Sequence, residues 1–278
     1  MLQRPSITVV YCAIDDLISN VSRAVPGFFE FLDELHQVKI PCVWITSRTR
    51  LELDPAIRKV GQSSPFIAEG GCGVYLPEDY FHLKPTKSTR FARFTVIPVA
   101  SPQPFAENAL DEMAEETGIE VVPVRTLSPR ELSQNAGVPQ REAELLRQRD
   151  FDEFFFFAGA SDADIAQFQS AAAQKNIQVR PRGNFWSLAV GANLSTCIRE
   201  LSGLYERSFR TRPFNIGIAS LEEAPGLFSS CNRAIFLRDR TFNGAVPTSP
   251  SAPAPLSLSL FAPDTWETAL GAIFEKRL

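Results

Sequence analysis

Histidine and cysteine are too few and too scattered in this sequence to form the metal or redox sites that they usually build. Histidine occurs twice, at His36 and His82, which excludes a histidine-rich metal site. The five cysteines include no CxxC pair and lie far apart, at Cys12, Cys42, Cys72, Cys197 and Cys231. This spacing is typical neither of a zinc knuckle nor of a disulfide framework. We therefore expect a function that uses other side chains.

The sequence also lacks a basic excess and long apolar segments. The formal net charge is -4 and the pI is about 5.4, and no Lys/Arg run occurs, which argues against general binding to nucleic acid or a membrane surface. No apolar run approaches the roughly 20 residues of a membrane-spanning helix. The N-terminal "MLQRPS" leaves no room for a signal peptide before the first predicted strand. We expect a cytoplasmic protein without nucleic-acid or membrane partners.

Strand and helix patterns alternate at both ends of the chain. Near-continuous apolar segments that predict buried strands are "ITVVY" (7–11), "PCVWITS" (41–47), "FNIGIAS" (214–220) and "AIFL" (234–237). Helical patterns separate them, for example at 26–38 and 193–209. Buried strands alternating with helices predict a parallel sheet covered on both faces. A Pro/Ser/Ala-rich loop at 243–257 and a C-terminal helix beginning after Asp264 complete this part.

The middle of the chain has a different pattern. Strands are predicted around 93–100, 119–124, 151–159 and 177–191, with helices at 105–118 and 162–175. This pattern favours a self-contained α+β module with a mostly antiparallel sheet, in which the run "FFFF" fills both faces. The predicted fold class is α/β, with a Rossmann-like core at 1–85 and 190–278 and an inserted α+β cap at 86–189. Such caps usually cover the carboxyl ends of the core strands, where open α/β sheets bind ligands.

A series of segments along the chain carries a family resemblance. In order they are "IPCVWITSRTRLEL", "PFIAEGGCGVYLP", "RDFDEFFFF", "RPRGNFWSLAVGAN", "IGIASLEEAPGLF" and "APDTWETAL". Together they resemble the motifs of the mannosyl-3-phosphoglycerate phosphatases, which are members of the haloacid dehalogenase (HAD) superfamily. The resemblance covers nearly the whole chain. It implies an HAD-like Rossmannoid core with a parallel sheet, a Cof-type (type IIB-like) cap and phosphoric monoester hydrolase activity.

The resemblance implies a two-carboxylate reaction, and this chain departs from it. In the superfamily an Asp at a strand end attacks phosphorus, and a second Asp two residues on acts as general acid and base. Against the family's "DLDGT" this chain has "CAIDD", so Cys12 stands at the nucleophile and Ile14 at the acid/base. No shift of register restores the pair, because Asp15 and Asp16 are adjacent and would point to opposite faces of an extended strand.

The remaining motif positions differ as well. The family uses a Thr or Ser and a Lys to hold the phosphoryl oxygens, and further acids to hold Mg2+. Here Leu194 stands at the Lys position, and Ala219 and Glu223 stand at the metal-binding positions. Thr46, in "ITSR", keeps the phosphate-contacting hydroxyl. We therefore predict that no Mg2+ binds, although the family uses it, with Glu223 the sole candidate ligand.

Each candidate residue has a structural alternative. Cys12 is either a substitute nucleophile or a buried core cysteine, which we favour because nothing nearby in sequence would lower its pKa. Asp15 and Asp16 either keep a catalytic role or, as we favour, cap the following segment. Thr46, Ser47 and Arg48 form either an anion grip or a structural turn.

The segment Glu69-Gly70 either contacts a sugar hydroxyl or, as we favour, makes a tight turn. Arg48, together with Arg180 and Arg182 of the cap's final strand, suggests a cleft mouth with few compensating acids. Such a mouth would attract a small anion, such as phosphate or a sugar phosphate.

Two functional hypotheses follow. The favoured one is a catalytically inactive, phosphatase-like protein that acts by binding a ligand or a protein partner. The alternative is an active sugar-phosphate phosphatase of the mannosyl-3-phosphoglycerate type that uses substituted residues.

Overall fold

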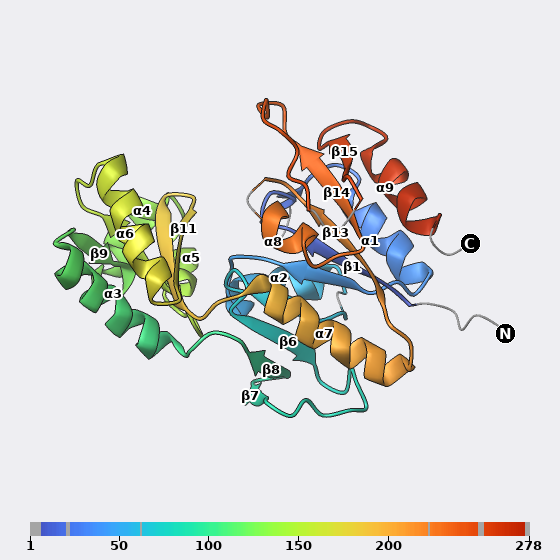
Figure 1. Ribbon diagram of the computed structural model, residues 1–278, viewed down its shortest axis with the longest axis horizontal. Coiled ribbons are helices and arrows are strands. Elements are labelled where there is room, and N and C mark those ends of the chain that lie inside the picture. Colours follow the sequence, from blue (N-terminus) through green and yellow to red (C-terminus); the bar gives the residue numbers. More distant parts are fainter. Residues whose placement is uncertain (1–6, 21–22, 62, 222, 250–252, 276–278) are drawn as a thin grey trace.

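The protein consists of a large mixed sheet with helices on both faces and a separate, smaller antiparallel sheet (Figure 1). The computed structural model describes residues 7–20, 23–61, 63–221, 223–249 and 253–275. The predicted α/β class, with a parallel sheet and an inserted α+β unit, is confirmed. The N-terminal "MLQRPS", on which the expectation about a signal peptide rested, lies outside the described residues.

The large sheet has nine strands in the order β15-β14-β13-β1-β4-β5-β6-β8-β7. It is parallel from β15 to β5 and antiparallel from β5 to β7. Its strands are β1 (Thr8–Ala13), β4 (Cys42–Ile45), β5 (Phe66–Ala68), β6 (Gly73–Pro77), β7 (Thr89–Phe91), β8 (Phe94–Pro98), β13 (Phe214–Ala219), β14 (Arg233–Arg238) and β15 (Leu256–Ser259). Strand β1 lies in the parallel region and is buried along its whole length, which explains its continuous apolar sequence.

Helices cover both faces of this sheet. One face packs against α1 (Phe28–Gln37), α2 (Arg50–Lys59) and α9 (Thr265–Phe274), and the other against α7 (Leu194–Phe209) and α8 (Ala224–Phe228). In the first layer the Trp266 ring lies 5.0 Å from Phe28 and 4.9 Å from Phe31, between ring centroids. Helix α7 runs across the other face, as Figure 1 shows. Burial of these aromatic side chains joins the C-terminal helix to the N-terminal one.

The smaller sheet, which we call the cap sheet, is antiparallel with the order β11-β12-β10-β9. The cap elements are α3 (Gln103–Thr117), β9 (Val121–Pro123), η1 (Val124–Thr126), α4 (Pro129–Ala136), α5 (Gln140–Leu146), β10 (Glu153–Phe157), α6 (Asp162–Gln174), β11 (Ile177–Arg182) and β12 (Phe185–Val190). The run "FFFF" fills both faces, as predicted. Phe155 and Phe157 pack with α3 and α6, whereas Phe154 and Phe156 pack with α4 and α5.

The predicted layout differs from the structure at three places. The predicted cap begins at 86, but β7 and β8 pair with β6 in the large sheet. The predicted loop at 243–257 reaches into β15, which pairs in parallel with β14. A short hairpin, β2 (Ile18–Asn20) and β3 (Arg23–Ala24), follows β1 and was not predicted. Among the described residues, no helix is long and apolar enough to cross a membrane.

Candidate functional site

The carboxyl ends of β1, β4 and β13 meet at the junction with the cap, since β1 lies between the other two in the parallel sheet. A cavity of about 440 Å3, which we call the cleft, lies there. Its core side is lined by Asp15, Asp16, Ser47, Arg48 and Glu52, and its cap side by Ala136, Val138, Leu146, Phe154, Arg182, Gly183, Asn184 and Phe185. The structure thus brings five of the predicted site residues, Asp15, Asp16, Ser47, Arg48 and Arg182, into one cavity.

Cys12 and Ile14, at the two motif positions for carboxylates, have no exposed surface. Both belong to the hydrophobic core on the α1 side of the sheet. Burial, followed by the neighbouring Cys42, raises the pKa of the Cys12 thiol well above its usual value. The reactive thiolate is therefore disfavoured. The favoured interpretation of Cys12 as a buried core cysteine agrees with this environment.

The two acids that follow lie in a turn rather than on the strand. Strand β1 ends at Ala13, and the Leu17 N–H donates to the Ile14 carbonyl at 3.0 Å. Asp15 and Asp16 both line the cleft, so the expectation that they point to opposite faces is wrong, because it assumed that the strand continued. Among the described residues, their hydrogen-bond partners lie after two other strands of the sheet rather than in the segment that follows. Asp15 accepts hydrogen bonds from the end of β4, and Asp16 accepts one from Ser220 after β13.

Thr46, Ser47 and Arg48 form a compact turn after β4. The Thr46 hydroxyl donates to Asp15 Oδ1, and the Ser47 N–H donates to Asp15 Oδ2 at 2.7 Å. The Arg48 N–H donates back to Thr46 Oγ1 at 3.0 Å, and its guanidinium donates to the Ile18 carbonyl at 2.5 Å. The polar groups proposed to grip an anion therefore already hold groups of this chain.

The Glu69-Gly70 segment makes a tight turn outside the lining of the cleft. Both residues have positive φ angles, 51° and 64°. A Cβ on Gly70 would lie 2.7 Å from Arg182 Nη2, so the absence of a side chain lets this guanidinium approach. The Glu69 carboxylate, 2% exposed, accepts backbone N–H groups from the cap segment 150–152. These contacts favour the turn interpretation and assign Glu69 to the cap–core connection.

Glu223, the candidate metal ligand, faces two cap arginines. Its carboxylate lies 3.3 Å from Arg182 Nη1 and 3.7 Å from Arg180 Nη1, and it is 6% exposed. It lines a second cavity of about 280 Å3, together with Leu194 at the former Lys position. Guanidinium groups already balance its charge, so this carboxylate does not fit a Mg2+ ion. Within the described ranges, no group of three His, Cys, Asp or Glu side chains could hold a metal.

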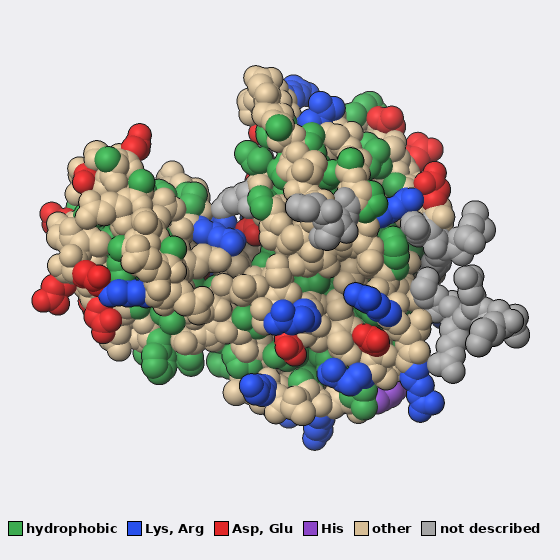
Figure 2. Space-filling view, in the orientation of Figure 1, with side chains coloured by type: hydrophobic (Ala, Val, Ile, Leu, Met, Phe, Trp, Pro, Cys, Tyr) green, Lys and Arg blue, Asp and Glu red, His purple; other side chains and the backbone are tan. Residues whose placement is uncertain are grey.

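The charges around the two cavities are mixed. The acids Asp15, Asp16, Glu52 and Glu223 and the basic residues Arg48, Arg180 and Arg182 line them. The premise of a basic mouth with few acids is therefore wrong. Basic and acidic side chains also lie next to each other at the cap–core junction in Figure 2. The cleft combines this polar core side with an apolar cap side that includes Phe154 and Phe185.

Arg149 is not among the residues predicted for the site, yet it joins the cap to the core. Its guanidinium pairs with Asp152, donates to the Ser47 carbonyl at 2.8 Å and lies 3.6 Å from the centroid of the Phe154 ring. Its side chain also lies 3.7 Å from Glu52, next to the Ser47 turn. The signal in the sequence was the segment "RDFDEFFFF", which carries the family resemblance and begins at Arg149.

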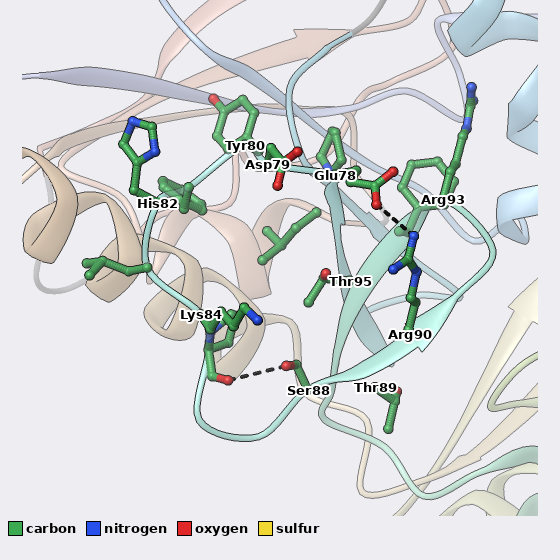
Figure 3. A pocket seen from close by; sticks show the side chains of 16 residues that line it. Glu78, Asp79, Tyr80, His82, Lys84, Ser88, Thr89, Arg90, Arg93 and Thr95 are labelled. Atoms are coloured by element: carbon green, nitrogen blue, oxygen red, sulfur yellow. Dashed lines mark hydrogen bonds and ion pairs between the residues drawn. The ribbon is translucent and has the colours of Figure 1, made fainter.

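A larger cavity, of about 730 Å3, lies at the edge of the large sheet (Figure 3). It is formed by the loop 78–88 with β7 and β8. Arg90 points towards Glu78 there, with 2.6 Å between Nη2 and Oε1. This cavity does not share a lining residue with the cleft. Because it is not at the carboxyl ends of the parallel strands, we place the candidate site at the cleft.

Comparisons with known proteins agree with the sequence motifs. No family model matches the chain. A glucosyl-3-phosphoglycerate/mannosyl-3-phosphoglycerate phosphatase of Methanococcoides burtonii is 24% identical over 197 residues, which cover 70% of this chain and 72% of that protein. A mannosyl-3-phosphoglycerate phosphatase of Pyrococcus furiosus is 20% identical over 211 residues, covering 76% of this chain and 84% of the relative.

Solved structures give the same result for the fold. A phosphatase of the haloalkanoate (HAD) superfamily from Bacteroides thetaiotaomicron superposes with a TM-score of 0.61 at 16% identity, covering 99% of this chain and 97% of that one. A subclass IIB HAD sugar phosphatase superposes with a TM-score of 0.55 at 11% identity, covering 83% and 87%. The chain thus has an HAD-like fold with an inserted cap. Within that fold it is similar to mannosyl-3-phosphoglycerate phosphatases, which confirms the resemblance seen in its motifs.

Proposed function

We propose that this protein is a phosphatase-like binding protein, which holds a small ligand in the cleft without hydrolysing a phosphate ester. The observation that carries the proposal is the state of the two motif positions on β1. Cys12 and Ile14 replace the carboxylates, and both are buried without exposed surface. Aspartyl-phosphate chemistry needs a nucleophile that reaches the phosphorus atom, and these side chains face the core.

The nearby acids offer no simple replacement. Both oxygens of Asp15 accept hydrogen bonds, from Thr46 and Ser47. Asp16 accepts one from Ser220. A carboxylate held in this way is a weaker nucleophile, since each donor stabilises its negative charge in the resting state. Leu194 supplies no cation for the phosphoryl oxygens, and Glu223 is paired with cap arginines.

The cleft favours a small molecule over a protein segment as the occupant. Its volume of about 440 Å3 lies within the range of small-ligand sites, and its lining combines charged and polar side chains on the core side with apolar side chains on the cap side. Binding of a protein partner is the other non-catalytic role. In that case no small molecule would bind in the cleft.

The second candidate is an active sugar-phosphate phosphatase. It is favoured by the similarity to curated phosphatases over 70% of the chain. In that case Asp15 would have to leave its present partners to act on the substrate. The two candidates make opposite predictions for a single assay.

That assay measures phosphate release from mannosyl-3-phosphoglycerate, glucosyl-3-phosphoglycerate and a panel of sugar phosphates, with and without Mg2+. The Methanococcoides burtonii phosphatase is the positive control. We expect no release above that of heat-denatured protein. Mg2+-dependent turnover that is lost in Cys12→Ser or Asp15→Asn would establish the second candidate.

A Mg2+ titration by calorimetry tests the cofactor prediction separately. We expect no binding heat at millimolar Mg2+, because guanidinium groups surround the Glu223 carboxylate. Saturable binding that disappears in Glu223→Gln would contradict this expectation.

A further inference from the structure

Two hydrogen-bond donors converge after β4 and form what we call the anion cradle, the Thr46 hydroxyl and the Ser47 N–H. Both point to one position at the carboxyl end of the strand, beside β1. Thr46 has no exposed surface, so its hydroxyl is held in place by packing. The Arg48 N–H donates to Thr46 Oγ1 at 3.0 Å. Since this contact occupies an acceptor site of the hydroxyl, the Thr46 proton is directed to the cradle.

The side chain of Asp15 fills the anion cradle. One carboxylate oxygen accepts from Thr46 Oγ1 and the other accepts from the Ser47 N–H at 2.7 Å. A tetrahedral oxyanion would use the same two donors with two of its oxygens. The carboxylate therefore takes the place in the cleft that a phosphate group would need.

The backbone holds Asp15 in this position. The Ile14 N–H donates to the Ile45 carbonyl at 3.0 Å, which links the turn to the end of β4. The N–H groups of Leu17 and Ile18 both donate to the Ile14 carbonyl, at 3.0 and 2.9 Å. Because the turn is fixed on both sides of Asp15, its carboxylate needs little reorganisation to stay in the cradle.

The other cations of the cleft and of the neighbouring second cavity also have partners in this chain. Arg48 donates to the Ile18 carbonyl, and Arg180 and Arg182 pair with Glu223. A second anion entering beside Asp15 would meet a negative charge and donors that are already used. These contacts therefore argue against the phosphate binding that we expected from the sequence.

We propose that Asp15 is a built-in anion plug, which occupies the cradle and excludes phosphate and phosphorylated ligands from it. The inference rests on the proposed function and narrows it, since the ligand of the cleft then carries no phosphoryl group at this position. Asp15 acts here as a specificity-determining residue. Its removal would restore an oxyanion site.

The test is the affinity of inorganic phosphate for the full chain, measured by calorimetry and by 31P line broadening. Asp15→Ala empties the cradle and is expected to bind phosphate at least tenfold more tightly than the wild type. Asp15→Asn is the matched control, because its amide keeps the volume of the side chain and one acceptor oxygen, and so still fills the cradle, while losing the charge. It is expected to stay within about twofold of the wild type.

Asp16→Ala controls for net charge. Asp16 lines the same cleft but accepts a hydrogen bond from Ser220, so this variant loses one negative charge and keeps the plug. We expect no gain in phosphate affinity. In Asp15→Ala, the further change Thr46→Val is expected to remove the gain, which would locate the phosphate in the cradle.

Three results would overturn the proposal: no gain in Asp15→Ala, an equal gain in Asp15→Asn or Asp16→Ala, or tight phosphate binding by the wild type. Thermal melting shows whether each variant is folded. If Asp15→Ala unfolds, Asp15→Gly replaces it, because glycine stands at this position in the family's "DLDGT" motif. The proposed function fails by a different measurement, turnover of a phosphate ester by the wild type. The two failures are therefore distinguishable.

Discussion

Glu69 is a single buried side chain that fixes how the cap segment leaves the core. Its carboxylate accepts N–H groups from Asp150 at 3.0 Å, Phe151 at 2.8 Å and Asp152 at 3.1 Å. In Glu69→Gln an NH2 group replaces one acceptor oxygen and faces backbone donors. We expect the free energy of unfolding to fall by about 1–3 kcal/mol, the cost of unsatisfied buried donors. Chemical denaturation measures it.

The control for this prediction is Glu78→Gln. Glu78 is also a carboxylate with a nearby donor, but its side chain is 58% exposed and pairs with the 71% exposed Arg90. Exposed ion pairs contribute little, so a change below about 0.5 kcal/mol is expected. An equal loss in both variants would show that the backbone contacts of Glu69 carry no special weight.

The residues of the site were predictable in type more than in geometry. Asp15, Ser47 and Arg48 follow neighbouring strands whose carboxyl ends meet at one edge of a parallel sheet, and the structure brings them into one cavity with Arg182 of the cap. The contact between Asp15 and the end of β4 was not predictable, since it depends on β1 ending at Ala13. One additional extended residue would have turned the carboxylate away.

At the scale of elements, the residue before α1 is a glycine that packs against the C-terminal helix. Gly27, the residue before α1, has φ 79°, and a Cβ there would lie 2.8 Å from Trp266 Cδ1. The Trp266 indole N–H donates to the Pro26 carbonyl at 2.9 Å. Gly27→Ala would therefore strain the backbone and displace the ring. We expect a loss of about 2–4 kcal/mol, from roughly 1–2 for the left-handed conformation and the rest for overpacking.

Gly118→Ala is the matched control for Gly27→Ala. Gly118 ends α3 with φ 68°, and a Cβ there would meet nothing within 4 Å. The free energy of unfolding of this variant should fall only by the cost of the left-handed conformation, about 1–2 kcal/mol. Thermal or urea unfolding compares the two. Equal losses would mean that Trp266 moves aside freely and that its packing adds no constraint.

Long periodic elements were predictable from sequence, whereas short edge elements were not. Helix α7 (Leu194–Phe209) and strand β1 have strong apolar patterns and lie close to their predicted ranges. Strand β15 follows a Pro-rich stretch and pairs along one edge with β14. Its sequence "LSLS" has no continuous apolar run, because the strand lies at the edge of the sheet with intermediate to exposed side chains. Composition alone cannot separate such a strand from a loop.

For the whole molecule, the division into core and cap followed from the change of pattern near the middle of the chain. The exact start of the cap did not, because β8 (Phe94–Pro98) resembles a cap strand in sequence and pairs with the core sheet. Pairing partners lie far apart in sequence, and local patterns do not contain them. The connection between the two parts is instead set by buried charges at their junction.

These buried charges predict how the cap moves. Arg182 is the last residue of β11, and its Nη1 atom lies 3.3 Å from Oε1 of Glu223 at the start of α8. Their side chains are 5% and 6% exposed. Removing one member of a buried pair leaves a costly unpaired charge. Because the two residues belong to the cap and the core, opening of the cap can return that charge to water without unfolding either part.

We therefore expect Glu223→Gln to shift the molecule towards an open cap. The radius of gyration from small-angle X-ray scattering should rise, and proteolysis in the connections 99–102 and 191–193 should become about tenfold faster, which corresponds to ~1.4 kcal/mol of lost cap–core coupling. Arg182→Ala should act in the same direction, and the double variant should add little to Glu223→Gln, since that change already removes the pair between Arg182 and Glu223. Arg90→Ala, which breaks an exposed pair within the core, is the control. Unchanged scattering and proteolysis in Glu223→Gln would show that the cap is held by its other contacts, the Glu69 and Arg149 networks, and that this ion pair does not control it.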